Sequence, residues 1–507
     1  MLAAAAEAGA DPRRRGGRPT WLRSRWCVAC LALPFLACLV VVAVFPDGRP
    51  FAVWQLVLWL AFVGALALLS DQRLLNPVQA GALFFYSWFG VGPLVILLFG
   101  LNAGIGDETW RFYPAGTRSL PFVACGLVLY ALAARAGARF VGRRRWGFRC
   151  FAAGQTALEG RTLVTFFVLG GSLVLLLEVL PALGIQGISS VNFLGGKRTD
   201  VWWVGVLDSL STVLTLANVV AISSIVAPRL RRLRHLPLIG VGVLLFLLVR
   251  SLSSGWKGQF LLPVAWLAIA FLTERQRPPL LLLASLAAVF LLFLEPFVSE
   301  ARNEARIRGV VDPAGRVEVF QEVLRNQLQG NRQKPDPSSR MFHLNALFRG
   351  IFPLAGGLLE RCTATEGPWH GDTIERAVFG VIPRAFYPDK PDWEVGNFFA
   401  RDVGGTMGLL DPANEEHQAA ISIPIEIAGN LGWLAGLSSF AILGFAWATL
   451  SALVLGPDPA LHPWNPYFVL TTGVLESPLL ALLAQGRDFL ILGAFIALVW
   501  RLQGRHL

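Results

Sequence analysis

The chain has 507 residues, of which 54% are hydrophobic and only 15% are charged, and its formal net charge is +11. Soluble domains carry about 25% charged residues, so this composition excludes an ordinary soluble protein and indicates one that uses the lipid bilayer as its solvent. The positive charge does not indicate nucleic-acid binding, because many Lys and Arg lie in short connectors between apolar runs, where the positive-inside rule places them.

The apolar runs predict an all-α, polytopic integral membrane protein. They are continuous rather than alternating, as in VACLALPFLACLVVVAVF, so they favour helices and exclude a β-barrel. Because each span needs about 20 apolar residues, we expect about twelve transmembrane helices. The predicted spans lie near residues 27–45, 51–69, 78–99, 118–134, 162–183, 204–226, 236–252, 259–273, 279–298, 430–455, 466–485 and 488–502.

These spans set the domain boundaries and the orientation. Basic connectors at 135–149, 228–235 and 274–277 fall on the same side of the membrane as the two basic ends of the chain. The positive-inside rule therefore places both termini in the cytoplasm and the long polar segment outside. The predicted parts are a basic cytoplasmic N-terminus (1–26), transmembrane helices (27–298), a large extracytoplasmic loop (299–420), further transmembrane helices (421–502) and a cytoplasmic tail (503–507).

The long polar segment 299–420 is where we expect the function to lie. Its stretch 316–329 spaces Val317, Phe320, Leu324 and Leu328 on one face, which predicts a helix lying against the spans or the interface. The stretch 342–359 is apolar enough to dip into the membrane, but its Gly and Pro residues argue against a full span. So many large apolar residues indicate a folded lid rather than a disordered loop.

Positive charges predicted on the outer side break the positive-inside trend, and they favour an anionic ligand. Arg suits bidentate capture of phosphate, and the i,i+4 spacing of Arg302 and Arg306 places them on one helical face. A lipid-linked pyrophosphate at the outer leaflet fits such a site. The alternative is that these residues are interfacial anchors or pair with Glu300 and Glu304. The outward cations are Lys197, Arg198, Lys257, Arg302, Arg306, Arg308, Arg340, Arg349 and Arg384.

A family resemblance appears in the stretch GVIPRAFYPDKPDWEVGNFFA at 380–400. It resembles the IPR-x-x-[WY]-P-x-K-P signature of bacterial oligosaccharide repeat-unit polymerases, the Wzy-type O-antigen polymerases. Weaker similarities lie in PIEIAGNLGWLAG (424–436), SSGWKGQ (253–259) and RNEARIRG (302–309). The signature positions are Ile382, Pro383, Arg384, Tyr387, Pro388, Lys390 and Pro391, and the second patch adds Glu426, Asn430 and Gly432.

The resemblance implies a glycan polymerase of the bacterial inner membrane, with loop 299–420 in the periplasm. Its substrate would be an undecaprenyl-pyrophosphate-linked oligosaccharide for O-antigen, capsule or exopolysaccharide. The donor is already activated, so no cofactor is expected. Implied partners are the lipid bilayer, a chain-length regulator and other glycan-export proteins, with no nucleic acid.

The same resemblance suggests roles for individual residues. Arg and Lys would stabilise the pyrophosphate leaving group, and a general base would accept the proton of the attacking hydroxyl. The sequence does not choose among Glu304, Glu426, His343 and Asp389 as that base. The implied catalytic residues are Arg302, Glu304, Arg306, Arg384 and Glu426. The implied substrate-binding residues are Lys197, Arg198, Lys257, Arg308, Arg340, His343, Arg349, Lys390 and Asn430.

Other functions stay open at this point. Asp389, Asp392 and Glu394 are close enough in sequence to hold Mg²⁺ or Mn²⁺, but Lys390 and Pro391 intervene, so we expect no metal. An O-antigen ligase or another lipid-linked-sugar glycosyltransferase would also use a large outward loop rich in Arg. A flippase for lipid-linked sugars is disfavoured because the chain shows no internal repeat.

Overall fold

The structure is a computed structural model, and it describes most of the helical part of the chain. The described residues are 25–44, 48–69, 76–95, 113–144, 160–182, 202–227, 230, 235–254, 257–275, 297, 300–301, 304–305, 308, 313–329, 351–382, 387, 398–407, 421–456 and 462–502. All regular elements among these residues are helices, and none of the residues forms a strand. The described part of the chain is therefore all-α, as predicted.

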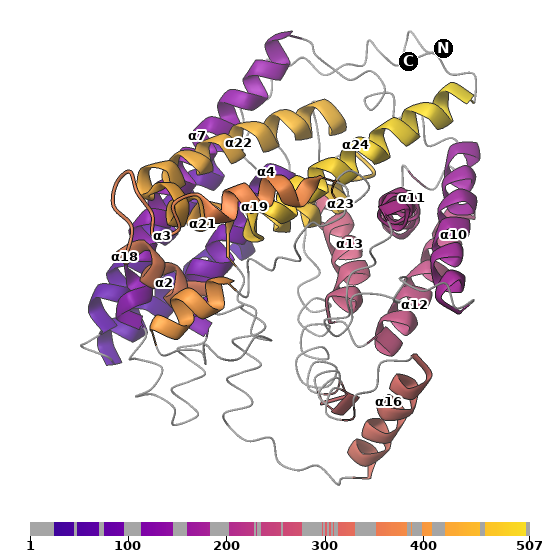
Figure 1. The fold of residues 1–507 in the computed structure, drawn as a ribbon, viewed down its shortest axis with the longest axis horizontal. Coiled ribbons are helices and arrows are strands. Elements are labelled where there is room, and N and C mark those ends of the chain that lie inside the picture. The colour runs from indigo at the N-terminus through magenta and orange to yellow at the C-terminus, as the bar shows by residue number, and fades with distance from the viewer. Residues whose placement is uncertain are drawn as a thin grey trace.

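Figure 1 shows the described helices along the chain. In the first half they are α2 (Arg25–Val44), α3 (Arg49–Leu68), α4 (Pro77–Tyr86), η4 (Ser87–Val91), α7 (Ser119–Arg144), α10 (Gly160–Ala182), α11 (Trp202–Ser224), α12 (Leu236–Ser254) and α13 (Lys257–Arg275). In the second half they are α16 (Pro313–Leu328), α18 (Ile351–Glu360), α19 (Asp372–Val381), η7 (Ala400–Gly404), α21 (Ile423–Leu431), α22 (Trp433–Leu455), α23 (Asn465–Thr471), η9 (Thr472–Glu476) and α24 (Leu479–Leu502).

Five of the described helices are long and apolar enough to cross a membrane. Each spans at least 18 residues with few charges, which matches the thickness of a bilayer core. These helices support the prediction of a membrane-embedded protein. Their ranges are Arg49–Leu68, Pro77–Val95, Tyr113–Gly142, Trp433–Leu455 and Leu479–Leu498.

The ends of most helices agree with the predicted apolar runs, but the C-terminal part needs a correction. The predicted runs 466–485 and 488–502 are not two matching helices. Short α23 and η9 come first, the helix breaks at Ser477–Pro478, and α24 then continues unbroken to Leu502. Proline favours the start of a helix over its interior, so the break falls before Leu479. The predicted run 279–298 lies outside the described residues apart from Phe297.

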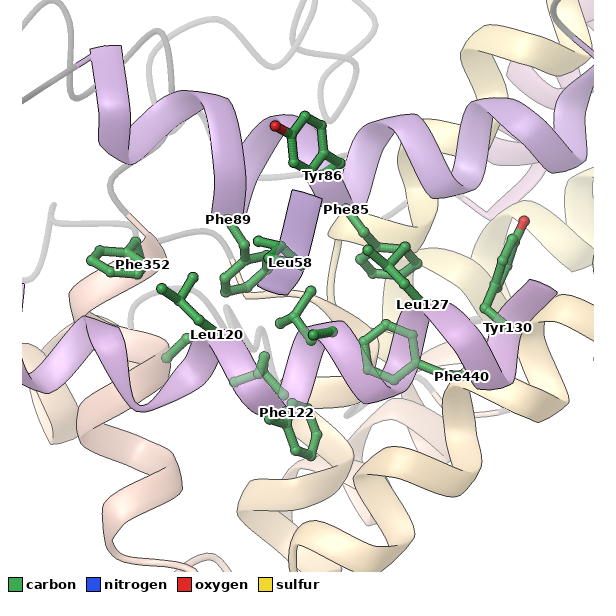
Figure 2. Close-up of a cluster of buried hydrophobic side chains, with 14 of the residues drawn as sticks. Leu58, Phe85, Tyr86, Phe89, Leu120, Phe122, Leu127, Tyr130, Phe352 and Phe440 are labelled. Atoms are coloured by element: carbon green, nitrogen blue, oxygen red, sulfur yellow. The ribbon is translucent and has the colours of Figure 1, made fainter. Parts of the chain in front are cut away.

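One core holds the bundle of α3, α4, α7 and α22 together. Aromatic side chains fill it, with the rings of Phe62 and Tyr86 stacked at a centroid distance of 4.2 Å. Figure 2 shows Phe85 and Phe440 facing each other between the helices, with ring centroids 4.9 Å apart. A second core joins α10 and α11 to α23 and α24. Figure 1 shows α10–α13 on the other side of the molecule from α2, α3 and α18.

Close approach of α7 and α22 depends on small residues. A Cβ at Gly444 would collide with the backbone carbonyl of Tyr130, and one at Gly137 would lie 2.6 Å from the carbonyl oxygen of Phe445. Small residues let helix backbones approach closely in membranes, where van der Waals packing drives association. Glycine at these two positions therefore sets how closely α7 and α22 can pack.

The helix predicted at 316–329 is present as α16, and its predicted apolar face is described in part. Val319 and Val323 are buried and Phe320 packs beside them, whereas Leu324 is exposed. Their partners are Phe297, Ala301 and Ala305, which are helical residues that precede α16 in the chain. The side chains of Val317 and Leu328 lie outside the described residues, so of the predicted face Phe320 is packed and Leu324 is exposed.

We predict that Gly444→Ala lowers the stability of the bundle, because the new methyl group meets the carbonyl of Tyr130. Gly64→Ala in α3 is the matched control, since a Cβ there meets none of the described atoms within 4 Å. In an open helical position, Ala in place of Gly stabilises by about 1 kcal/mol. Thermal unfolding in detergent should give a lower midpoint for Gly444→Ala and an equal or higher one for Gly64→Ala. Equal midpoints for both variants would contradict close α7–α22 packing.

Candidate functional site

The described residues contain only part of the predicted site. Glu304, Arg308, Glu426 and Asn430 are described, and Lys257 is described as the first residue of α13. The remaining predicted residues lie outside the described part of the chain. They are Lys197, Arg198, Arg302, Arg306, Arg340, His343, Arg349, Arg384 and Lys390.

Glu426 and Asn430 lie on a short helix, α21, that folds back onto α22. The chain turns at Gly432, which has φ of +85°, a left-handed conformation that glycine adopts without strain. A Cβ at Gly432 would also lie 2.5 Å from the backbone nitrogen of Glu366. Gly436 of α22 packs directly on Ala428 and on the carbonyl of Pro424. The α21–α22 turn therefore depends on glycine at two positions. Gly432 allows the chain to reverse, and Gly436 allows α22 to pack closely on α21.

The segment 361–371 lies over this turn and satisfies its backbone. The N–H groups of Trp433 and Leu434 donate to the carbonyls of Thr363 (3.0 Å) and Ala364 (3.1 Å). The first N–H groups of a helix have no partner inside the helix, so this segment supplies the cap of α22. The N–H of Trp369 donates to the carbonyl of Gly429 (2.9 Å), which attaches the same segment to α21.

Asn430 links α21 to the first turn of α19. Its Oδ1 accepts from the backbone N–H of Thr373 (3.2 Å), and its Nδ2 donates to the Thr373 hydroxyl (2.6 Å) and to the carbonyl of Glu426 (2.7 Å). Gly371 is the N-cap residue of α19 and has no side chain to provide the cap. Asn430, which is distant in sequence, takes that role, so the start of α19 is held by α21.

Glu426 is fully enclosed and joins three helices. Its Oε2 accepts from the N–H of Leu479 (2.5 Å), the first residue of α24, where the helix dipole favours an acceptor. Its Oε1 has no hydrogen-bond partner among the described residues. Burial raises the pKa of Glu426 to about 7, while the Leu479 N–H and the Thr373 hydroxyl act to lower it. The carboxyl group is therefore poised between its two protonation states near neutral pH.

Glu304 and Arg308 form part of a different cluster, on the far side of the molecule near α16. The Nε of Arg308 donates to Glu304 (2.8 Å), and its two terminal nitrogens donate to Glu322 of α16 (2.6 and 3.0 Å). The pair with Arg308 keeps the pKa of Glu322 below its usual range. In this structure Arg308 holds two carboxylates rather than an open anion site, which agrees with the ion-pair alternative for this residue.

The structure brings the patches of family resemblance together in part. The signature stretch starts in the last turn of α19, and α19 is attached to α21 of the second patch by Thr373 and Asn430. The third patch spans the end of α12 and the start of α13, and the fourth contains Glu304 and Arg308. Arg308 of the fourth patch pairs with Glu322 of α16, and α16 lies beside α12, which ends in the third patch. These two patches therefore lie near α12 and α16, away from α19 and α21 (Figure 1).

Sequence reasoning missed a second polar cluster, formed by Arg361, Trp369 and Asp402. Arg361 pairs with Asp402 through both terminal nitrogens (3.0 and 3.2 Å), and the indole N–H of Trp369 donates to the same carboxylate (2.7 Å). Asp402 lies in η7, a π-helical turn. The cluster attaches η7 to the segment 361–371. No spacing rule connects residues so far apart in the chain, so only the fold reveals the contact.

No metal site is seen in the described part of the chain. Among these residues, no three His, Cys, Asp or Glu side chains gather as a metal site would require. The three carboxylates considered from the sequence as metal ligands lie outside the described residues. They are Asp389, Asp392 and Glu394. The expectation that no metal is bound stays a prediction.

We predict that Glu426 makes stability depend on pH between about 4.5 and 7. Its pKa in the folded protein is about 7, above the ordinary value of 4.5, so the folded state favours the neutral form. The stabilisation is complete below pH 4.5 and is lost as the pH rises through 7, by about 3 kcal/mol in total. Glu426→Gln stays neutral, so unfolding measured from pH 4.5 to 8 should show a flatter profile for this variant.

The control for this experiment is Glu318→Gln, which removes an exposed carboxyl group on α16. Its profile should follow that of the wild-type protein. Parallel profiles for the wild type and Glu426→Gln would show that Glu426 does not titrate in this range.

Comparisons with known proteins identify no relative of this chain. No model of a protein family matches it, and neither a curated protein nor a solved structure does. Its function is therefore inferred from its own residues and their arrangement.

Proposed function

We propose that the chain is a glycan polymerase that joins undecaprenyl-pyrophosphate-linked oligosaccharide repeat units at the outer leaflet of a bacterial inner membrane. The observation that carries this proposal is the attachment of α19 to α21. The signature stretch begins in the last turn of α19, and Asn430 in the second resembling patch holds the first turn of the same helix. Ile382, the first signature position, follows α19 directly, and this supports the proposal that the two patches act together.

The proposed topology follows the charge distribution of the sequence. Five described helices can cross a membrane, and we infer about twelve spans when the other apolar runs are counted. Both termini would be cytoplasmic and loop 299–420 periplasmic, because the basic connectors gather on the opposite side from that loop. The described parts of the loop are folded as α16, α18, α19 and η7, as a lid over a membrane-embedded site would be.

The reaction would be a substitution at an anomeric carbon. A hydroxyl at the non-reducing end of one lipid-linked unit attacks the anomeric carbon of the growing chain. The new glycosidic C–O bond forms, the bond to the lipid pyrophosphate breaks, and the hydroxyl proton passes to a base. Arg302, Arg306 and Arg384 would stabilise the negative charge that develops on the pyrophosphate. The donor supplies its own leaving group, so no nucleotide is consumed.

The geometry favours a positioning role for Glu426. The carboxyl group is enclosed and holds the first residue of α24 beside α19, so in this structure it does not reach an exterior ligand. By fixing α19 it would fix the point at which the signature stretch leaves the bundle. Glu304 is paired with Arg308. His343 and Asp389 stay candidates for the base, together with Glu426 if α19 moves aside.

The proposal is tested with purified protein in detergent that receives only lipid-linked repeat units. We predict longer lipid-linked products without ATP, detected by mass spectrometry, and the same result in the presence of a chelator. Arg384→Ala should slow elongation by about 100-fold, as expected for loss of a charge-stabilising group. Arg384→Lys should restore it only in part, because a point charge cannot make a fork contact.

Arg308→Ala is the matched control, because that guanidinium is held by two carboxylates. It should leave elongation within about threefold of the wild type, since surface ion pairs contribute little. Absence of elongation by the wild-type protein would contradict the polymerase. Two further assays test the alternatives. Transfer of the glycan to an added lipid A acceptor would favour the ligase, and movement of intact units across vesicles that contain the reconstituted protein would favour the flippase.

A positioning role of Glu426 is distinguished from a general-base role by comparing Gln with Ala at this position. Gln keeps an oxygen that accepts from the Leu479 N–H, so a positioning role predicts near-normal elongation for Glu426→Gln. Glu426→Ala removes the acceptor and should cost about 100-fold, as displacement of a site by about 1 Å can. A general base would instead be lost in both variants. Elongation rates measured at equal amounts of folded protein therefore decide between the two roles.

A further inference from the structure

Helix α19 is packed on one side and exposed on the other. Thr373 and Ala377 are fully buried, and a Cβ at Gly380 would collide with the side chain of Leu480. The buried residues recur at intervals of four and three, which places them on one helical face. This face rests on α21 and on the first turn of α24, and Figure 1 shows α19 between them. On the opposite face Asp372, Glu375, Val378 and Phe379 are exposed.

The level of α19 relative to the membrane follows from its neighbours. Two helices that can cross a membrane begin beside it, one at Trp433 and one at Leu479. Thr373 is bonded to Asn430, three residues before the first of these helices, and Gly380 touches Leu480 in the second. The first turn of α19 therefore lies next to the N-terminal end of α22, and its last turn lies against the N-terminal end of α24.

The exposed face of α19 changes character along the helix axis. Asp372, Glu375 and Arg376 are exposed in the first two turns, and an ion pair joins Arg376 to Asp372. Val378 and Phe379 follow and are 54% and 46% exposed. Charged groups belong in water, and an exposed apolar group at the membrane surface belongs in hydrocarbon. The change from one to the other falls within a single turn.

Aromatic residues mark the same level. The ring of Phe379 lies 6.3 Å from that of Tyr387, which is itself exposed. Tyr and Trp are enriched where the bilayer meets water, because their rings are apolar and carry one polar group. The aromatic residues therefore agree with the boundary indicated by the charges.

We propose that the boundary of the lipid bilayer crosses α19 between Arg376 and Val378, so that the last turn of α19 contacts lipid acyl chains. The partner of this exposed surface is lipid rather than another protein, because Gly380, in the same turn as Val378 and Phe379, packs on Leu480 at the start of a helix that can cross a membrane. This inference stands without the polymerase. If the proposed function also holds, the lipid contact places Tyr387 of the signature stretch, whose ring lies beside that of Phe379, at the membrane surface.

The experiment places a single spin label at 375 or at 378 in a cysteine-free background and reconstitutes the protein in nanodiscs. The two positions share one exposed face, so each is the control for the other. Electron paramagnetic resonance then measures collision with oxygen, which enters lipid, and with a water-soluble nickel chelate. Val378→Cys should collide more with oxygen and Glu375→Cys more with nickel, each by several-fold.

A second measurement uses the unmodified chain. Hydroxyl-radical oxidation in nanodiscs should modify the exposed His370, which lies just before α19, and spare Phe379. Strong reaction of the 378 label with nickel, or oxidation of Phe379, would overturn the proposal in favour of an aqueous surface. Exclusion of both collision reagents from 378 would overturn it in favour of a protein partner. None of these readouts depends on glycan elongation, so failure here leaves the polymerase test intact.

Discussion

The junction between α21, α19 and α24 is the constraint on which this part of the structure depends. Asn430 and Glu426 each bind the first turn of a different helix, Asn430 at Thr373 and Glu426 at Leu479. Inside a bundle a polar group is costly unless it is paired, and removing one member leaves the others unsatisfied. The two side chains therefore define where α19 and α24 begin, and a change at either would affect both.

This junction explains how a polar segment can be joined to an apolar bundle. The segment 361–371 caps α22 with its carbonyls, and the Arg361–Asp402 pair attaches η7 to the same segment. The described segment 361–371 is therefore bound through specific hydrogen bonds, with apolar packing of α18 beside it. A loop held in this way can present its polar residues at a fixed height above the membrane, which is the property that the proposed chemistry requires.

Much of the fold could be predicted from the sequence, because bilayer thickness sets the length of each apolar run. The ends of α2, α3 and α10–α13 lie within a few residues of the predicted runs. The break before α24 was missed because apolar residues continue on both sides of Ser477–Pro478, so the run looks unbroken in the sequence. On α16 Leu324 is exposed while Val319 and Val323 are buried, because their partner is another helical turn whose position depends on the fold.

The site was predicted less completely, for a related reason. Glu426 and Asn430 were found through family resemblance, but their partners Thr373 and Leu479 were not, because long-range contacts leave no spacing pattern in a single sequence. Arg308 shows the opposite case. Its charge suggested a phosphate ligand, whereas the fold supplies Glu322, which lies too far along the chain for helical spacing to suggest the pair. Charge alone does not reveal whether a cation already has a partner.

The most direct test of the account is the surface glycan of a bacterium that lacks this chain. If the chain joins repeat units, a separate ligase still transfers single units, and electrophoresis of the glycan should show one rung in place of a ladder. A strain carrying the intact chain on a plasmid should recover the ladder. A full ladder without the chain would contradict the account, and so would long glycans held on the carrier lipid with none on the acceptor.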